Sequence, residues 1–570
     1  MKIVCVGALL LASTSTDSLC AAGQPDSHPM PPVILISIDT LRADHVGAYA
    51  YKRVATPNID AFATGGTVFE NIECQTPLTL PSHTSLLTST YPFANGIQEN
   101  AEMIPPGAVT LANVLKSNGY KTAAFVSSVF LEREMGLDQG FDTYDSPFNF
   151  AAFSPVSGEM FFGGAPDASY VARERREGAL TVHAALRWLA ANRGWPVFVF
   201  VHLFELHTPY TVPEREGISR YDAQLELEDE IVGRLKTALT QSGWWDKSLT
   251  VLFSDHGEGL GDHGEQSHGY FIYESTLHVP LIFHWPAGHS GPPQRARQTG
   301  GLIDVAPTIL EFLHVPAPAL FAGASLFAAG QRAVYSESLH THDSFGWAPL
   351  RSVRVGNYKY IEAPKAELYD LEKDPTERSN IVLTNPGTAR ALRAQLEKLL
   401  ASHAPRRVTA PAGSTTPETE KLLASLGYLG RGPQGRGTSA GADPKDRLAE
   451  FHLYEKAIDQ VADRHLDAAV VLLKQVLAQD ATNTLARRDL ASCYLDMHDY
   501  AKARVNFQQV VRVAAEDYPS QFGLGIAAKH LGLVDEAHTH LEVACRLAPQ
   551  ATQCRHELDT LPQKSKSLPQ

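Results

Sequence analysis

Cysteine and positive charge are both scarce in this sequence of 570 residues. The formal net charge is −14, which disfavours a surface that neutralises nucleic-acid phosphates, so we expect no nucleic-acid partner. Of the six cysteines, four follow the first 22 residues, Cys74, Cys493, Cys545 and Cys554, and these are too few and too scattered for a disulfide framework or a zinc finger. Cys545 and Cys554 stand close enough in the sequence to form at most one local bridge.

Long apolar runs are also scarce, and the one that resembles a targeting segment is N-terminal. It extends from Ile3 to Ala12 after a single lysine, and small residues then lead to Ala22. This order is typical of a secretory signal over residues 1–22, so we expect an exported protein, periplasmic or extracellular. A buried first strand is the alternative, and a lipid anchor on Cys20 is another that the nearby Asp17 disfavours. No later run approaches the ~18 apolar residues of a membrane-spanning helix, so none is expected after signal removal.

Short apolar runs alternate with longer amphipathic stretches across residues 32–405. Strands rich in Val, Ile and Phe with helices between them predict an α/β fold with a mainly parallel sheet, because such strands are buried on both faces. Four strands are expected, at Val33–Ile38, Lys121–Val126, Val197–His202 and Leu249–Ser254. Residues 350–361 alternate like an antiparallel strand pair, which predicts a small C-terminal subdomain.

The last part of the chain repeats every 34 residues. After a linker over residues 406–446, rich in Pro, Gly and Ser, alanines recur at Ala469, Ala503 and Ala537. A generic helical bundle has no reason to keep this period. Residues 447–561 resemble three tetratricopeptide repeats, which implies an all-α array whose concave face takes a protein or peptide partner.

Metal-type side chains follow three of the four predicted strands. Asp39 follows the first strand, Asp255 and His256 follow the fourth, and His202 ends the third. Ligands of an open parallel sheet gather beyond the carboxyl ends of its strands, so we expect these side chains to meet there. For Asp39 alone, helix capping is the more ordinary interpretation. Two carboxylates and an imidazole together suit zinc, or manganese if water is added.

A hydroxyl group completes the predicted site. Thr79 stands where a Pro-containing turn opens a helix within residues 76–92, so exposed amide groups and the positive end of the helix dipole would face an anion there. A hydroxyl beside a dication loses its proton readily and becomes a nucleophile. A helix-capping role is the alternative for Thr79.

Six segments between residues 33 and 381 resemble the sulfatase family of the alkaline-phosphatase superfamily. They read ILISIDTLRADHVGAYAY from Ile34, TLPSHTSLLT from Thr79, HLFELHTPY from His202, SDHGEGLGDHGEQSHGYFIYESTLHVPLI from Ser254, GLIDVAPTIL from Gly301 and ELYDLEKDPTE from Glu367. The resemblance implies an alkaline-phosphatase-like sandwich that hydrolyses an anionic sulfate or phosphate ester with the help of a divalent metal.

The resemblance also assigns roles to single residues. The positions that hold the metal are Asp39, Thr79, Asp255 and His256. Thr79 falls on the position of the nucleophile. His207 and His268 fall where the family places groups that contact the ester or protonate the leaving oxygen.

Three further histidines of these motifs are candidate substrate-binding residues. They are His83, His202 and His263. A second metal held by the clustered histidines is an alternative, but imidazoles near an anionic ester also serve as donors and acids without a metal, and we favour the donor role.

Two departures from the sulfatase pattern bear on the chemistry. Typical sulfatases carry a Cys or Ser that matures to formylglycine in a C/S-x-P-x-R segment, whereas this chain has Thr79 and His83 at the first and last of these positions. Threonine cannot become that aldehyde, so no formylglycine is expected. The paired aspartates after the first strand are reduced to Asp39 and Thr40, and the frequent Asn after the later Asp is His256. Zinc or manganese is therefore favoured over calcium.

These departures leave alternatives open. The T-x-P-x-H form resembles nucleotide pyrophosphatases and phosphodiesterases. We therefore expect phosphate esters as substrates no less than sulfate esters. A threonine nucleophile also resembles phosphoethanolamine transferases, which makes a phosphoryl or phosphoethanolamine transferase to an envelope acceptor one rival function. A catalytically inert binding protein that acts through its repeats is another, although an inert site has no need to retain nucleophile, ligands and histidines together.

Overall fold

The computed structural model describes most of the chain. The described residues are 30–100, 102–148, 175–289, 291, 293–328, 330–403, 441–547 and 552–562. The predicted signal over residues 1–22, with Cys20, lies outside them, as does most of the predicted linker over 406–446.

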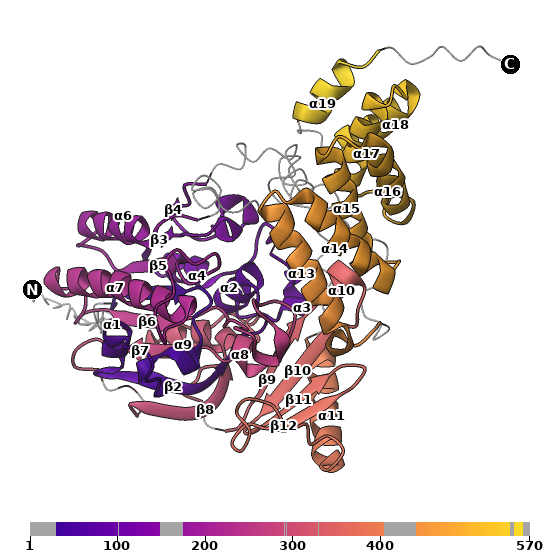
Figure 1. The fold of residues 1–570 in the computed structure, drawn as a ribbon. Coiled ribbons are helices and arrows are strands. Elements are labelled where there is room, and N and C mark those ends of the chain that lie inside the picture. Colours follow the sequence, from indigo (N-terminus) through magenta and orange to yellow (C-terminus); the bar gives the residue numbers. More distant parts are fainter. Residues whose placement is uncertain are drawn as a thin grey trace, which may run out of the picture. The chain divides into compact units, whose positions relative to one another are not determined.

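A large mixed sheet lies at the centre of the N-terminal region (Figure 1). Its strand order within the described residues is β4-β3-β5-β1-β6-β7-β2-β8. The four predicted strands are β1 (Val33–Ile38), β3 (Lys121–Phe125), β5 (Val197–Leu203) and β6 (Leu249–Phe253). They are adjacent and parallel, in the order β3-β5-β1-β6, so the prediction of a mainly parallel sheet is confirmed.

Four further strands extend this sheet beyond the sequence prediction. They are β2 (Gly66–Glu73), β4 (Thr143–Asp145), β7 (Leu281–His284) and β8 (Arg295–Gly301). β7 is antiparallel to both of its neighbours, β6 and β2, whereas β8 is parallel to β2 and β4 is parallel to β3.

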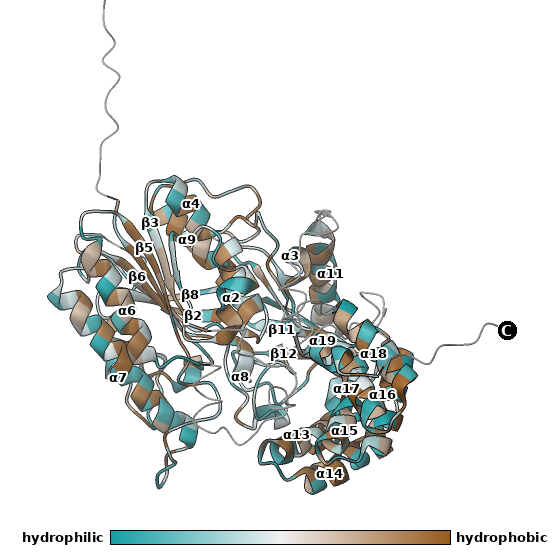
Figure 2. Cartoon of the chain, turned by 90° about the horizontal axis from the view of Figure 1, so that it is seen from above, coloured by the Kyte–Doolittle hydropathy of each residue, from teal (hydrophilic) through white to brown (hydrophobic). Residues whose placement is uncertain are grey.

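Helices cover both faces of the large sheet (Figure 2). On one face lie α2 (Thr79–Thr88), α4 (Leu111–Ser117) and α9 (Val305–Phe312), and on the other lie α6 (Gly178–Ala191) and α7 (Arg220–Gln241). Alternate residues of β1 enter the two cores, because Val33 and Leu35 pack on the first face and Ile34 and Ile36 on the second. Burial on both faces explains why these strands are almost continuously apolar.

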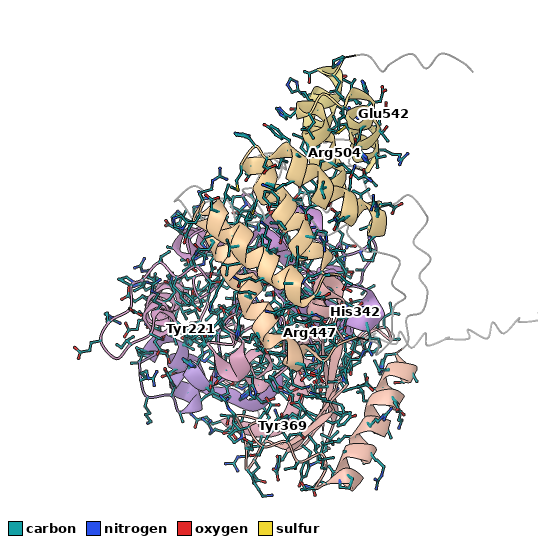
Figure 3. The ribbon with its side chains drawn as sticks, turned by 45° about the vertical axis from the view of Figure 1, so that its right-hand side comes forward. Tyr221, His342, Tyr369, Arg447, Arg504 and Glu542 are labelled. Atoms are coloured by element: carbon teal, nitrogen blue, oxygen red, sulfur yellow. A yellow bond between two sulfur atoms is a disulfide. The ribbon has the colours of Figure 1, made fainter. Side chains whose placement is uncertain are left out.

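A small antiparallel sheet follows the large one. Its order is β12-β11-β10-β9, with β9 (Ala333–Ser338), β10 (Leu350–Val355), β11 (Tyr358–Glu362) and β12 (Glu367–Asp370). Tyr369, labelled in Figure 3, lies on β12. The predicted antiparallel pair is confirmed, since Val353 of β10 stands opposite Tyr360 of β11.

A buried lysine joins the small sheet to the large domain. Lys359 of β11 is fully buried, and its Nζ lies 2.9 Å from Glu274 Oε1 and 3.0 Å from Glu377 Oε1. Glu274 begins the short helix α8 (Glu274–Leu277) and also pairs with Arg354 of β10 at 3.2 Å. Burial raises the pKa of Glu274, but the charges of Lys359 and Arg354 outweigh it and lower that pKa to about 2. Glu274 is therefore an anion held between two cations of the small sheet.

The C-terminal helices form a stack of pairs. They are α13 (Leu448–Ala462), α14 (Leu466–Gln479), α15 (Thr484–Asp496), α16 (Tyr500–Val513), α17 (Tyr518–His530), α18 (Val534–Leu547) and α19 (Thr552–Asp559). The repeated alanines Ala469, Ala503 and Ala537 are fully buried in α14, α16 and α18. Arg504 of α16, labelled in Figure 3, pairs with Glu536 of α18 at 2.8 Å.

Covalent and membrane features complete the description. Cys545 and Cys554 form a disulfide, which confirms the local bridge allowed by their spacing. Within the described residues, no helix combines the length and the apolar character needed to cross a membrane.

The Lys359 ion pairs generate a stability prediction. Replacing Lys359 with Met should lower the free energy of unfolding by about 3–5 kcal/mol, because buried carboxylates lose their cation. Guanidinium denaturation followed by tryptophan fluorescence measures the change. Lys373→Met is the control: Lys373 pairs with Asp370 at the surface, so its loss should leave the midpoint in place. Equal midpoints for both variants would contradict the structural role of Lys359.

Candidate active site and metal centre

The carboxyl ends of three adjacent strands bring the predicted site together. β5 and β6 flank β1 as parallel neighbours, so their last residues lie at one edge of the sheet. Asp39 directly follows β1, and Asp255 lies just beyond β6. His202 is the last residue but one of β5 and pairs in register with Ser37 of β1. All three side chains are fully buried.

Thr79 lies at the start of α2 beside these residues. Its Oγ1 is 3.3 Å from Asp39 Oδ2 and 3.5 Å from His256 Nε2. The backbone N–H of Leu80 donates to Asn100 Oδ1 at 3.0 Å, which holds the first turn of the helix in place. One ligand atom each from Asp39, Asp255 and His256 lies within 4.8 Å of the others. Side chains that are distant in the sequence therefore meet around one point.

The pKa values of the two carboxyl groups are raised in this buried site. Burial raises the pKa of Asp39 to about 8 and that of Asp255 well above its usual range, where the neighbouring Asp39 raises it further. Asp39 Oδ1 and Asp255 Oδ2 are buried and have no hydrogen-bond partner among the described residues. A cation between them would satisfy both oxygen atoms, so this donor set fits a metal ion.

His256 is prepared to act as a neutral ligand. Its ring lies within the site with Nδ1 2.9 Å from the carbonyl oxygen of Gly257, a hydrogen bond that the protonated Nδ1 donates. This assigns the lone pair to Nε2, the nitrogen that faces Thr79. Burial lowers the pKa of His256 to about 4, so the imidazole is uncharged at neutral pH.

His83 and His202 lie on the inner side of the same cluster. His83 Nδ1 donates to the carbonyl oxygen of Thr79 at 2.7 Å, and its Nε2 accepts from Ser37 Oγ at 2.8 Å. His202 Nε2 is 3.3 Å from Asp39 Oδ2, and its Nδ1 has no partner among the described residues. His83, His202 and Asp255 form a second group with metal-ligand spacing.

His207 and His268 lie together at another side of the cluster. Their ring centroids are 5.1 Å apart, and that of His268 is 4.4 Å from His256. His207 stacks on Phe204, and its Nδ1 donates to the carbonyl oxygen of Thr208 at 2.6 Å. His268 Nδ1 is 3.1 Å from Oε1 of the buried Glu258, which fixes the plane of the ring.

His263 is placed differently from the other predicted histidines. Its Nε2 donates to the carbonyl oxygen of Thr376 at 3.0 Å, and its ring stacks on Tyr273 with centroids 3.6 Å apart. These contacts are with the C-terminal part of the domain, and the structure does not bring His263 into the cluster around Asp39.

Three residues near the site were not predicted from the sequence. Asn100 supports α2, Glu258 orients His268, and Arg175 donates to the carbonyl oxygens of His207 and Thr208, each at 3.0 Å. Glu258 stands inside the SDHGEG motif, so its position could have been inferred. Arg175 and Asn100 stand outside the quoted motifs and give no such signal.

Family models match most of the chain. The Sulfatase model matches residues 31–315, half of the chain, and a model described as N-sulphoglucosamine sulphohydrolase, C-terminal, matches residues 261–405. A Tetratricopeptide repeat model matches residues 460–517.

Known proteins are similar over about two thirds of the chain. The Delta 4,5-hexuronate-2-O-sulfatase of Bacteroides thetaiotaomicron is 24% identical over 424 residues, which cover 64% of this chain and 87% of that protein. The multifunctional alkaline phosphatase superfamily protein PehA of Trinickia caryophylli is 24% identical over 508 residues, with coverages of 67% and 98%.

Solved structures show the same fold. A 2-O GAG sulfatase structure superposes with a TM-score of 0.54 at 20% identity, covering 66% of this chain and 92% of that one. The phosphonate monoester hydrolase of Agrobacterium radiobacter superposes with a TM-score of 0.52 at 20% identity, with coverages of 65% and 96%. The chain therefore belongs to the sulfatase family, the sulfuric ester hydrolases of the alkaline-phosphatase superfamily, and carries a C-terminal tetratricopeptide array.

Proposed function

We propose that this chain is a metal-dependent sulfate-ester hydrolase in which Thr79 is the nucleophile. The observation that carries the proposal is the position of Thr79 Oγ1, 3.3 Å from Asp39 and 3.5 Å from His256 at the start of α2. The residues that would hold a divalent cation are Asp39, Thr79, Asp255 and His256. Such a cation supplies Lewis-acid stabilisation of the ester oxygens. Its mixed oxygen and nitrogen ligands favour zinc or manganese over calcium.

The chain's own residues account for both halves of the displacement. Thr79 Oγ1 attacks the sulfur of the ester, and its hydroxyl already donates to Asp39 Oδ2, so this carboxylate is placed to take the proton. The bond from sulfur to the alcohol oxygen breaks as His268 gives that oxygen a proton, or as His207 does so once its Nε2 has bound a second proton, because its Nδ1–H is donated to Thr208. Water then hydrolyses the threonyl ester, because threonine cannot re-form an aldehyde to expel sulfate as formylglycine does.

The first prediction concerns the nucleophile. Thr79→Ala should lower kcat for an aryl sulfate by at least about 10³-fold, since the covalent step is lost, and Thr79→Ser should retain part of the activity. Initial rates with 4-nitrocatechol sulfate measure both, and circular dichroism checks that the variants fold. Near-normal hydrolysis by the Ala variant would reject the covalent role.

The second prediction concerns the metal. Asp255→Asn should reduce the zinc or manganese content of the purified protein several-fold, because the metal would lose one of its two carboxylate ligands. Elemental analysis after dialysis against each metal measures the content. Asp229→Asn is the matched control, since Asp229 is a buried aspartate that accepts from the backbone of Asn58 and Ile59, away from the cluster. Equal metal content in the two variants would argue against Asp255 as a ligand.

The third prediction concerns the leaving group. His268→Gln should slow hydrolysis of an alkyl sulfate by about 10²–10⁴-fold, because a poor leaving group needs a proton, yet change the rate for a nitrophenyl sulfate far less. Parallel assays with the two esters measure the difference. If both rates fall equally, His268 acts on binding or folding instead, and the same pair of assays on His207→Gln then tests the second donor.

Phosphate esters are the second candidate substrates. Thr79 favours them because the sulfatase aldehyde is absent, and the similar hydrolase from Agrobacterium radiobacter is described as acting on phosphonate monoesters. A panel of aryl sulfate, phosphate monoester, phosphodiester and phosphonate with metal-loaded protein decides between the classes. Product that forms only with an added acceptor alcohol would favour a transferase, and no turnover at all would favour a binding protein.

Two further predictions concern other parts of the chain. The predicted partner of the repeat array remains a protein or peptide, and export remains a prediction from residues 1–22.

A further inference from the structure

The first helix of the repeat array contacts the segment that carries His268. This segment folds back on itself, since the N–H of Gly259 donates to the carbonyl of Ser267 at 2.6 Å and the N–H of Gly261 donates to that of Glu265 at 2.7 Å. The tip of the fold is at Gly264. Residues 259–267 therefore form a narrow loop whose returning strand leads directly to His268.

Two residues of α13 contact the tip of this loop. His452 Nε2 donates to the carbonyl oxygen of Gly264 at 2.5 Å. Gly264 has a φ of +85°, and a Cβ on it would stand 3.1 Å from Leu448 Cδ2, so the Leu448 side chain lies directly against the tip. The loop thus receives a hydrogen bond and an apolar contact from the same turn of one helix.

α13 also supports the residues just after His268. The ring centroids of Phe451 and Tyr270 are 3.8 Å apart. The ring of Tyr270 also packs edge-on against that of His340, with centroids 5.0 Å apart. The N–H of Tyr270 donates to Oε1 of the buried Glu265 at 2.8 Å. Tyr270 is therefore fixed from the array on one side and from its own loop on the other, two residues from His268.

The contact between α13 and the sulfatase domain has a core of its own. Phe345 and Trp347 stack with centroids 4.6 Å apart and belong to the same buried apolar cluster as Phe451, Tyr454 and Ala457. The backbone N–H of Ala348 donates to the carbonyl of Ala442 at 2.9 Å, just ahead of Arg447, which precedes α13 and is labelled in Figure 3. A shared apolar core and a backbone hydrogen bond join α13 to the sulfatase domain, which a flexible linker alone would not do.

We infer that α13 is a structural part of the active site, in which Phe451 and His452 are positioning residues that hold the His268 segment in place. The inference rests on the proposed function in one respect, because His268 is the proposed proton donor. Aromatic packing on Tyr270 fixes the distal end of the segment and the Gly264 contact fixes its tip, so His268 and its partner Glu258 keep their 3.1 Å contact. A displacement of about 1 Å at a proton donor is enough to cost roughly 10²-fold in rate.

The test uses full-length variants and two readouts. Phe451→Ala should lower kcat for an alkyl sulfate by about 10-fold or more with KM changed by less than about 3-fold, and should raise deuterium uptake in peptides covering residues 259–271. Phe451→Leu should restore most of both signals, since it refills the space against Tyr270. Phe507→Ala is the control: Phe507 is equally buried, on α16 of the next repeat, and its loss should cost similar stability without changing either readout.

The two readouts separate the possible failures. Deuterium uptake does not depend on catalysis, so a raised uptake in Phe451→Ala with no effect on the alkyl sulfate rate would keep the contact and remove His268 from the chemistry. Unchanged uptake over residues 259–271, or equal changes in the Phe451→Ala and Phe507→Ala proteins, would overturn the inference.

Discussion

The site depends on the cost of burying two carboxylates side by side. Asp39 and Asp255 leave neighbouring parallel strands and are fully buried, and the side chains that pair with them through nitrogen are those of His83, His202 and His256. Burial lowers the pKa of each of these histidines, so the ring nitrogens offer lone pairs in place of positive charge. A cation would suit this arrangement, because it would accept both carboxylate oxygens and the imidazole lone pair.

The sequence predicts the parts of this fold that are buried on both faces. β1 and β5 read as continuous apolar runs because helices cover them on either side. β8, by contrast, has the sequence RARQTGG, and β4 has only three residues, so neither has the composition of a buried strand. Their pairing is decided by neighbouring strands in space, which no local pattern records.

The same distinction holds at the site. Asp39, Asp255 and His256 could be predicted because they follow recognisable strands, and Thr79 because it opens a helix in a recognised motif. Arg175 reaches the site from a segment with no motif, and its contacts are to backbone carbonyls, which leave no trace in the sequence. The contact of His263 with Thr376 could not be foreseen either, since a motif gives the identity of a side chain and not its direction.

The disulfide between Cys545 and Cys554 bears on how α19 is held to the repeat stack. In a repeat stack each unit contacts only its neighbours, so each helix is held by few contacts. The bridge ties α18 to α19, and α19 brings the fully buried Cys554 into the last apolar cluster with Phe522 and Leu541. A covalent bond therefore holds α19 to α18 in addition to the apolar packing, and its persistence is set by the redox potential of the surroundings.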